Sequence, residues 1–321
     1  MSFCTEFHNI LFADDTTLYE ANTNKQTVIS VFRAKFKVIY DWITFNQMSL
    51  NWDKTKIMYL TKQRDDIQFK EDVGTVFLDR FCDKTWKKIE VVTKFKLLGV
   101  TIDRSLTFGN YLKELRSRVH TRLFSIKNIF FLPFNVKLQF FKTFILPHFD
   151  YCNSLIVYFT DSVINQIEKL YNFCIFKLLK IDLKPMTLDE QKSRLNVYNL
   201  LPYRYRSFLR FCIFSRQILN KKILHQFHEL LSPIKHRLRN NETIYLEPNS
   251  RTIAGSRRLS IILPKFINKI VRYSYLISGS DFKTFILFNI SDFYNKFLSL
   301  RVNLSTGASA DLTEDDSFFI E

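Results

Sequence analysis

The chain has 321 residues, of which 46% are hydrophobic and 16% aromatic, and it contains 34 Phe but only 6 Gly and 7 Pro. This composition excludes wholesale disorder and is typical of a packed, mostly helical chain with one large or two medium domains. The 47 Lys and Arg residues exceed the 31 Asp and Glu residues, so the formal net charge of +16 favours a polyanionic partner such as nucleic acid.

The sequence predicts an intracellular protein, nuclear or cytoplasmic, because its first residues lack a basic region followed by an apolar core. Every apolar stretch is shorter than the roughly 20 residues that a bilayer span requires, so we expect no membrane span. The five Cys residues are far apart and lack metal-ligand spacing, and we expect reduced, mostly buried thiols. His225 and His228 are one helical turn apart, but no third ligand is near them in the sequence.

A hairpin with acid at its tip is predicted over residues 7–19, where two short apolar runs flank an Asp-Asp pair. An amphipathic helix follows. Its start shows a capping-box pattern at Thr23 and Gln26, and its apolar residues recur three and four positions apart from Ile29 to Ile43.

Short strands and a charged loop follow this helix. The loop covers residues 62–71, and Gly99 interrupts the last strand. The strands are predicted at 56–60, 73–78, 89–92 and 95–102. These elements predict a small α+β unit that ends near residue 105.

The pattern becomes helical after residue 105, where Leu112, Leu115 and Val119 mark one apolar face. Further helices, separated by Pro residues, are predicted at about 135–147, 161–181, 188–196, 203–231 and 264–300. Residues 235–258 are predicted to form a loop or linker, and 305–321 a mobile tail with an acidic end.

Phe12-Ala13-Asp14-Asp15 is the most informative motif of the chain. Polymerases place such carboxylates on two divalent cations, which activate a primer 3′-hydroxyl and stabilise the leaving pyrophosphate. Mg²⁺ prefers oxygen ligands, and a hairpin tip projects them. Because an isolated Asp-Asp pair is more often a solvated turn, the residues that follow have to decide between the two interpretations.

Two further motifs follow in a characteristic order. The predicted helix ends in Trp42 and is followed by Asn46-Gln-Met-Ser-Leu-Asn-Trp-Asp-Lys-Thr-Lys56 and later by Phe95-Lys-Leu-Leu-Gly-Val-Thr-Ile-Asp103. The three motifs together resemble the reverse transcriptases of non-LTR, LINE-type, jockey-like retrotransposons. Met48 stands where that family commonly has Leu, a conservative departure. The resemblance covers nearly all of residues 5–300 and is weak after 240.

This resemblance implies an α+β fold in which a partial polymerase palm is followed by a mainly helical, thumb-like region. It implies a truncated palm with a primer-grip-like hairpin over 1–105 and a basic thumb-like region over 106–240. A loop and a C-terminal helical segment would cover 241–304, before a flexible acidic tail. The expected partners are an RNA template and a DNA primer, and the expected cofactor is Mg²⁺ in a two-metal site.

The resemblance also implies roles for single residues. Asp14 would be the main metal-binding carboxylate of the hairpin, and Asp15 a second one. Lys54 would protonate or neutralise the departing pyrophosphate, although it could equally be a solvated surface lysine beside Asp53. Leu98 and Gly99 would shape the primer grip, where a missing side chain allows close backbone approach, although Gly99 could only mark a bulge.

The helical region adds a candidate nucleic-acid surface. Between Arg194 and Arg239 many Lys and Arg residues accompany a single acid, Glu229. We expect the aromatic residues among them to lie mostly in the core, and only the basic face to be a binding candidate, with a merely solvated face as the alternative. The candidate phosphate contacts are Arg116, Arg122, Arg204, Arg206 and Arg210.

Three functions remain open at this point. Related enzymes carry fingers, a palm strand with the first metal-binding Asp and a Gly-containing nucleotide pocket before the hairpin, and the 321 residues contain none of these. We therefore expect part of an RNA-directed DNA polymerase that does not polymerise alone. The alternative is a non-catalytic, basic, nucleic-acid-binding module derived from a retroelement. A membrane-surface protein is the third possibility.

Overall fold

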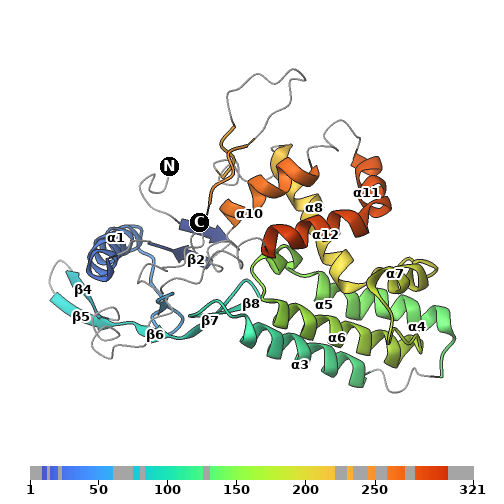
Figure 1. Ribbon diagram of the computed structural model, residues 1–321. Coiled ribbons are helices and arrows are strands. Elements are labelled where there is room, and N and C mark those ends of the chain that lie inside the picture. Colours follow the sequence, from blue (N-terminus) through green and yellow to red (C-terminus); the bar gives the residue numbers. More distant parts are fainter. Residues whose placement is uncertain are drawn as a thin grey trace. The chain divides into compact units, whose positions relative to one another are not determined.

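The computed structural model of the chain describes residues 9–12, 15–20, 24–60, 75–79, 84–125, 131–220, 230–233, 245–249, 259–271 and 279–302. The fold is α+β and mostly helical, with a few short strands (Figure 1). The chain divides into two compact units, and the boundary lies between Thr107 and Phe108. The strands belong to the first unit, and every described helix except α1 belongs to the second.

The strands of the first unit pair two by two. They are β1 (Asn9–Phe12), β2 (Asp15–Leu18), β3 (Lys56–Met58), β4 (Thr75–Asp79), β5 (Lys84–Lys88), β6 (Glu90–Val92), β7 (Lys94–Leu97) and β8 (Val100–Asp103). Antiparallel pairs join β1 to β2, β4 to β5 and β7 to β8, whereas β3 and β6 pair in parallel. The predicted strand positions match β3, β4, β6, β7 and β8 closely, and β5 was not predicted.

Helix α1 (Lys25–Phe45) follows the first hairpin, as predicted, but its N-cap differs from the predicted one. The side chain of Asn24 accepts hydrogen bonds from the N–H groups of Gln26 (2.9 Å) and Thr27 (3.3 Å). Asn24 therefore satisfies two donors of the first helical turn, which is the role of an N-cap residue. Thr23, the predicted cap, lies outside the described residues.

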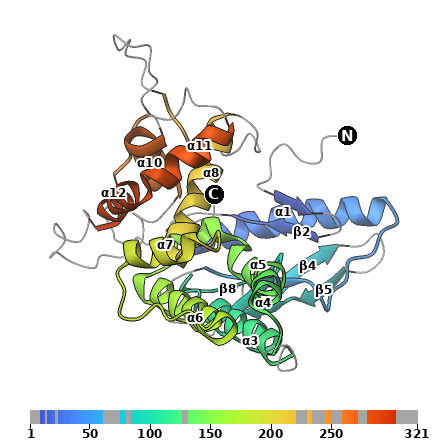
Figure 2. The same cartoon turned by 90° about the vertical axis from the view of Figure 1, so that its right-hand side faces the viewer.

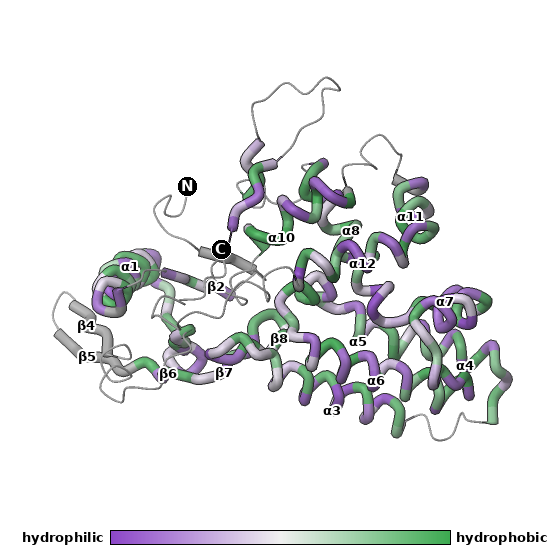
Figure 3. Tube along the Cα trace, in the orientation of Figure 1, coloured by the Kyte–Doolittle hydropathy of each residue, from purple (hydrophilic) through white to green (hydrophobic). Residues whose placement is uncertain are grey.

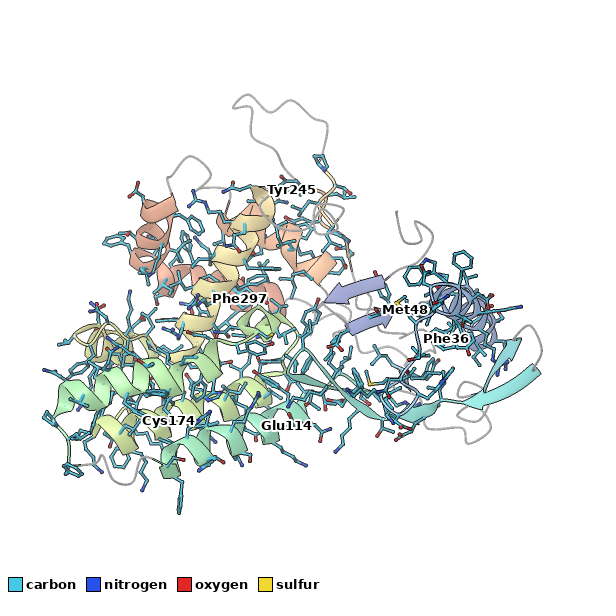
Figure 4. All side chains as sticks on the ribbon, turned by 180° about the vertical axis from the view of Figure 1, so that it is seen from behind. Phe36, Met48, Glu114, Cys174, Tyr245 and Phe297 are labelled. Carbon is cyan, nitrogen blue, oxygen red and sulfur yellow. The ribbon has the colours of Figure 1, made fainter. Side chains whose placement is uncertain are left out.

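One hydrophobic cluster holds the elements of the first unit together. Ile29, Phe36 and Tyr40 of α1 are buried against Ile57 of β3 and against Ile89, the residue just before β6. Figure 4 labels Phe36 on α1. Partly buried side chains complete the cluster: Leu18, Phe32, Leu50, Trp52 and Val91. The apolar positions of the predicted amphipathic helix thus face this core.

The second unit begins with helices that pack around α6. They are α3 (Gly109–Ser125), α4 (Phe134–Phe140), the π-helical turn η2 (Phe141–Ile145), α5 (Leu146–Asp150), the 3-10 turn η3 (Asn153–Val157), α6 (Asp161–Leu179), α7 (Leu188–Asn196) and α8 (Tyr203–Leu219). Figures 1 and 2 both show α3 and α4 beside α6. The core side chains of α6, including Ile164, Cys174 and Leu178, are fully buried.

The predicted helix at 135–147 is divided into α4, η2 and α5. Pro147 at the start of α5 has no N–H, so it cannot donate the helical hydrogen bond to the carbonyl four residues earlier. The preceding turn is π-helical and buries Phe141 and Ile145 completely. Such π-helical turns are rare and occur mostly as single turns within α-helical segments.

The C-terminal helices are α10 (Leu259–Phe266), the π-helical turn η5 (Ile267–Val271), α11 (Gly279–Phe288) and α12 (Ile290–Val302). They pack on α8 in the same compact unit, although the sequence suggested a separate segment with one helical piece. Phe297 of α12, labelled in Figure 4, lies 5.4 Å from Phe208 and 5.9 Å from Phe211, measured between ring centroids. Both α8 rings are fully buried, as predicted for the aromatic residues of this helix.

Polar contacts fix α7 and α12 to α8. The hydroxyl of Tyr205 donates to Asp189 Oδ1 at 2.8 Å, and the hydroxyl of Ser291 donates to Asp189 Oδ2 at 2.9 Å. Helix α7 starts with a full capping box, in which Thr187 and Glu190 satisfy each other's backbone N–H groups. The bounds of α7 agree with the predicted helix at 188–196.

The described residues allow a check of the predicted absence of membrane spans and of the predicted free thiols. None of the described helices is both long and apolar enough to cross a membrane. Cys174 and Cys212 are buried and Cys152 is half-buried, and all three are free thiols, as predicted. Burial raises the pKa of Cys174 to about 12. Cys4, Cys82, His225 and His228 lie outside the described residues.

Candidate functional site

The hairpin predicted to carry the metal-binding carboxylates is present as β1 and β2. Phe12 pairs with Asp15, so a two-residue connection, Ala13-Asp14, joins the strands. Such short connections are typical of tight β-hairpins. Asp15 is exposed at the start of β2, whereas Asp14, the main predicted ligand, lies outside the described residues.

Lys54 lies in an exposed turn just before β3. The Asn51 side chain accepts a hydrogen bond from the Lys54 N–H at 3.1 Å, and the Asn51 carbonyl accepts one from the Thr55 hydroxyl at 2.8 Å. These contacts fix the backbone on both sides of the lysine. No ion pair of Lys54 occurs within the described part of the chain, so a solvated lysine remains an alternative.

One core connects the hairpin to the Lys54 turn. Leu18 comes three residues after Asp15 and Trp52 two residues before Lys54, and both pack on the same hydrophobic cluster. Trp52 lies 5.7 Å from Tyr40 of α1, measured between ring centroids. The first two sequence motifs are therefore anchored on a shared core by way of α1.

The described carboxylates do not form a metal site by themselves. Within the described ranges, no three His, Cys, Asp or Glu side chains gather closely enough to hold a metal ion. Asp15 supplies the type of oxygen ligand that Mg²⁺ prefers, but two-metal chemistry needs several such groups around each ion. The described residues thus do not fit a complete two-metal centre.

The third motif forms the hairpin of β7 and β8, with Leu98 and Gly99 as its two turn residues. Both have positive φ angles, 44° for Leu98 and 85° for Gly99. Type I′ hairpin turns require positive φ at both central positions, and Asn or Gly usually supplies it. Leu98 adopts this conformation against the preference of a leucine and exposes 38% of its surface.

Asp103 at the end of the third motif has a structural role that the sequence did not reveal. It is buried, and its Oδ1 and Oδ2 atoms accept hydrogen bonds from the N–H (2.9 Å) and the hydroxyl (3.1 Å) of Thr107. The contacts close the turn after β8. The motif thus contains a turn-forming residue beside its candidate binding residues.

Arg204 and Arg206 are engaged in contacts inside the second unit. Arg204 donates from Nε to Glu168 Oε2 at 2.8 Å, and also binds Asn165 and Tyr294. Burial alone would lower the pKa of Arg204, but the hydrogen bonds to Glu168 and Tyr294 outweigh it and raise the pKa. The Arg204 guanidinium thus connects α8 to α6 and α12, and its hydrogen-bond donors are not directed at solvent phosphate.

Arg206 forms two hydrogen bonds to Asp150, and the more exposed Arg210 contacts the same carboxylate at 3.2 Å. About half of the Arg210 side chain remains exposed, whereas that of Arg206 is mostly covered. Of the three arginines predicted on α8, only Arg210 combines exposure with a single weak contact. It remains a candidate phosphate contact.

Arg116 and Arg122 are both exposed on α3 but do not share a face. They are six positions apart, which corresponds to about 120° around a helix with 3.6 residues per turn. Burial, and then the charges of Arg118 and Arg122, lower the pKa of His148 of α5. Arg116 therefore belongs to a different surface.

Comparisons with protein-family models, curated proteins and solved structures give no match. The candidate site is therefore described from the geometry of this chain alone. In the first unit these are Asp15, Lys54, Leu98 and Gly99, together with Asp14 from outside the described ranges.

One group of exposed residues was missed from the sequence. It lies on α6 and at its C-cap residue Lys180, where cations and phenyl rings share a face: Lys169, Phe173, Phe176, Lys177 and Lys180. Their spacing of three and four residues could have revealed this face, but the high Phe content favoured assignment of all rings to the core. Only the solvent exposure of Phe173 and Phe176 separates them from buried Phe residues.

Proposed function

We propose that the first unit is the C-terminal part of a reverse transcriptase palm of the non-LTR retroelement type, and that the second unit is its basic, thumb-like region. In the complete enzyme this palm would take part in RNA-directed DNA synthesis. The observation that carries the proposal is the β1–β2 hairpin, whose register makes Ala13-Asp14 the connection between Phe12 and Asp15. A polymerase needs its acidic pair in such a position, because a hairpin tip projects carboxylates toward bound metal ions.

The order of elements after the hairpin supports the same proposal. Helix α1 leads from the hairpin to the Lys54 turn, and a single core holds both. The β7–β8 hairpin then places the exposed Leu98 and the half-buried Gly99 at its turn. A backbone turn without a bulky side chain at one of its two positions allows close approach of a nucleic-acid strand.

Mg²⁺ would supply charge stabilisation and activation of the primer hydroxyl in the complete enzyme. Since the described donors do not complete a two-metal centre, we derive no reaction step from them. Asp15 would bind metal together with Asp14 and with a further palm carboxylate from a longer chain. Lys54 would hold a positive charge near the departing pyrophosphate, and its fixed backbone limits where that charge can be.

Primer extension by residues 1–321 alone tests this proposal. We expect no more extension of a primed RNA template than in a buffer control, with either Mg²⁺ or Mn²⁺, because the upstream carboxylate and nucleotide pocket are not among these residues. Robust extension that Asp14→Ala abolishes would show that the 321 residues are a sufficient polymerase.

A second candidate function is a non-catalytic nucleic-acid-binding module that retains the acidic hairpin as a relic. The net charge of +16 favours it, as do the cations exposed on α3 and α6. The two functions differ in the reading frame upstream. A frame that continues into an F-x-D strand and a fingers region favours the polymerase, and its absence favours the module.

A further inference from the structure

Cations and phenyl rings alternate along the exposed face of α6. Lys169, Phe173 and Lys177 follow one another at four-residue intervals, and Phe176 and the C-cap residue Lys180 form a second row beside them. Phe173 and Phe176 are 37% and 46% exposed. The Nζ atoms of Lys177 and Lys180 lie 5.8 Å and 5.9 Å from the centroids of these two rings.

Helix α3 extends this face with further polar groups. Lys113, Arg116 and His120 are exposed and recur at spacings of three and four residues, so they lie on one side of the helix. The His120 ring lies 5.6 Å from the Phe173 ring, measured between centroids. The row on α3 and the row on α6 therefore meet and form one surface.

The two helices run in the same direction. Phe159, just before α6, contacts Tyr111 near the start of α3 at 5.8 Å, whereas His120 near the end of α3 contacts Phe173. Figures 1 and 2 both draw α3 and α6 side by side, and Figure 3 shows hydrophilic and hydrophobic residues alternating along both. The joint face is thus a strip that follows both helix axes.

The acidic residues of α3 and α6 lie off these exposed rows. Glu168 of α6 is bound to Arg204, and Asp161 is 3.5 Å from Arg301. Glu114 of α3, labelled in Figure 4, is half-buried; it follows Lys113 in the sequence but is not a member of the exposed row on α3. The exposed rows contain cations, one imidazole and phenyl rings, and the cations attract a polyanion.

We propose that this strip of α3 and α6 binds single-stranded nucleic acid, with Lys and Arg on the phosphates and Phe173 and Phe176 under the bases. The inference rests on the proposed nucleic-acid partner and specifies that this partner is single-stranded. Proteins that hold single strands combine a basic track with aromatic rings on which bases stack. A duplex keeps its bases stacked on each other, so it offers phosphates to the cations but no base to the rings.

The same composition fits a membrane surface less well. A membrane-bound helix needs a broad apolar face on one side and cations at its edges. Here each ring lies among cations, within 6 Å of an ammonium group in both cases. The charges would have to enter the lipid boundary together with the rings, which is unfavourable.

Fluorescence anisotropy with a labelled single-stranded RNA of about 15 nucleotides, and with a duplex of the same length, tests the strip. Changing Phe173 and Phe176 to Leu preserves apolar bulk but removes the stacking surface. We expect the Kd for the single strand to rise roughly tenfold or more, and the Kd for the duplex to change by less than about twofold. As the matched control, Phe144→Leu with Phe288→Leu removes two exposed rings elsewhere in the unit and should leave both Kd values unchanged.

A charge variant provides the second measurement. Changing Lys169, Lys177 and Lys180 to Gln should lower the salt slope of single-strand binding by about 2, at roughly 0.7 per lost phosphate contact. The control variant loses the same charge from α10, η5 and α11 through Lys265, Lys269 and Lys283 to Gln. Circular dichroism of all variants has to match the unchanged protein.

The outcomes separate this inference from the proposed function. Nucleic-acid binding that neither strip variant weakens overturns the strip but leaves the proposed partner intact. The absence of binding to any RNA or DNA overturns both. Flotation with anionic liposomes that the Lys variant abolishes and the Phe-to-Leu variant retains, without RNA binding, would assign the strip to a membrane surface instead.

Discussion

Arg206 of α8 binds Asp150 of α5 through two hydrogen bonds, from Nε to Oδ1 and from Nη2 to Oδ2, and both side chains are mostly covered. A guanidinium in this arrangement connects two helices and is a poor probe of nucleic-acid binding. Changing Arg204, Arg206 and Arg210 together would therefore alter stability and charge at once.

We expect Arg206→Gln to lower the free energy of unfolding of the second unit by roughly 1.5–3 kcal/mol, the net value of hydrogen bonds to charged groups. Arg210→Gln is the matched control. Its side chain is 51% exposed and contributes one contact of 3.2 Å, so we expect a loss of about 1 kcal/mol or less. Urea unfolding followed by circular dichroism measures both, and equal effects would contradict a structural role specific to Arg206.

The conformation of Leu98 leads to a second prediction. At φ 44° a leucine is strained, whereas Asn adopts this conformation readily, so Leu98→Asn should stabilise the β7–β8 hairpin by about 0.5–1 kcal/mol. Gly99→Ala should destabilise it by about 1 kcal/mol. Amide hydrogen exchange at Leu97 and Val100 reports both changes. Faster exchange in Leu98→Asn would mean that the leucine side chain supports the hairpin through packing.

Asp103 gives a third prediction. Asp103→Ala removes two hydrogen bonds to Thr107 from a buried position and should cost about 2 kcal/mol. Thr107→Ser keeps both donors and should be nearly neutral. Thr107→Val removes only the hydroxyl donor, so a double-mutant cycle with Asp103→Ala that gives no coupling energy would mean that the hydroxyl bond does not stabilise the turn.

The capping box of α7 predicts a pH dependence. Hydrogen bonds from the backbone N–H and then the hydroxyl of Thr187 lower the pKa of Glu190 below its usual value. A carboxyl whose pKa is lowered by folding stabilises the protein above its unfolded pKa, and this contribution disappears as the pH falls through the folded pKa. Gln can cap without titrating, so the stability difference between the protein and Glu190→Gln should shrink between about pH 5 and pH 3. A stability difference that stays constant over this pH range would mean that ionisation of Glu190 does not contribute to the cap.

Much of this arrangement follows from local sequence patterns. The two-residue connection between Phe12 and Asp15, the bounds of α7 and the buried face of α1 all arise from periodicity, turn preference and capping, which act over a few residues. The hydrogen bonds between Arg206 and Asp150 join residues that are 56 positions apart, and no sequence pattern predicts this pairing. For the same reason, sequence alone could not separate the exposed Phe173 from buried rings such as Phe211.

The central claim is that Asp14 belongs to a polymerase palm, and primer extension by a chain that joins residues 1–321 to an upstream palm strand and fingers region tests it most directly. With a primed RNA template and Mg²⁺, we expect extension that Asp14→Asn abolishes, because the hairpin loses a metal-binding carboxylate. Asp53→Asn, beside Lys54, is the control for a lost surface charge and should retain activity. Equal extension by Asp14→Asn, or no extension by a protein that contains the upstream palm strand, would contradict the assignment of the hairpin to a reverse transcriptase.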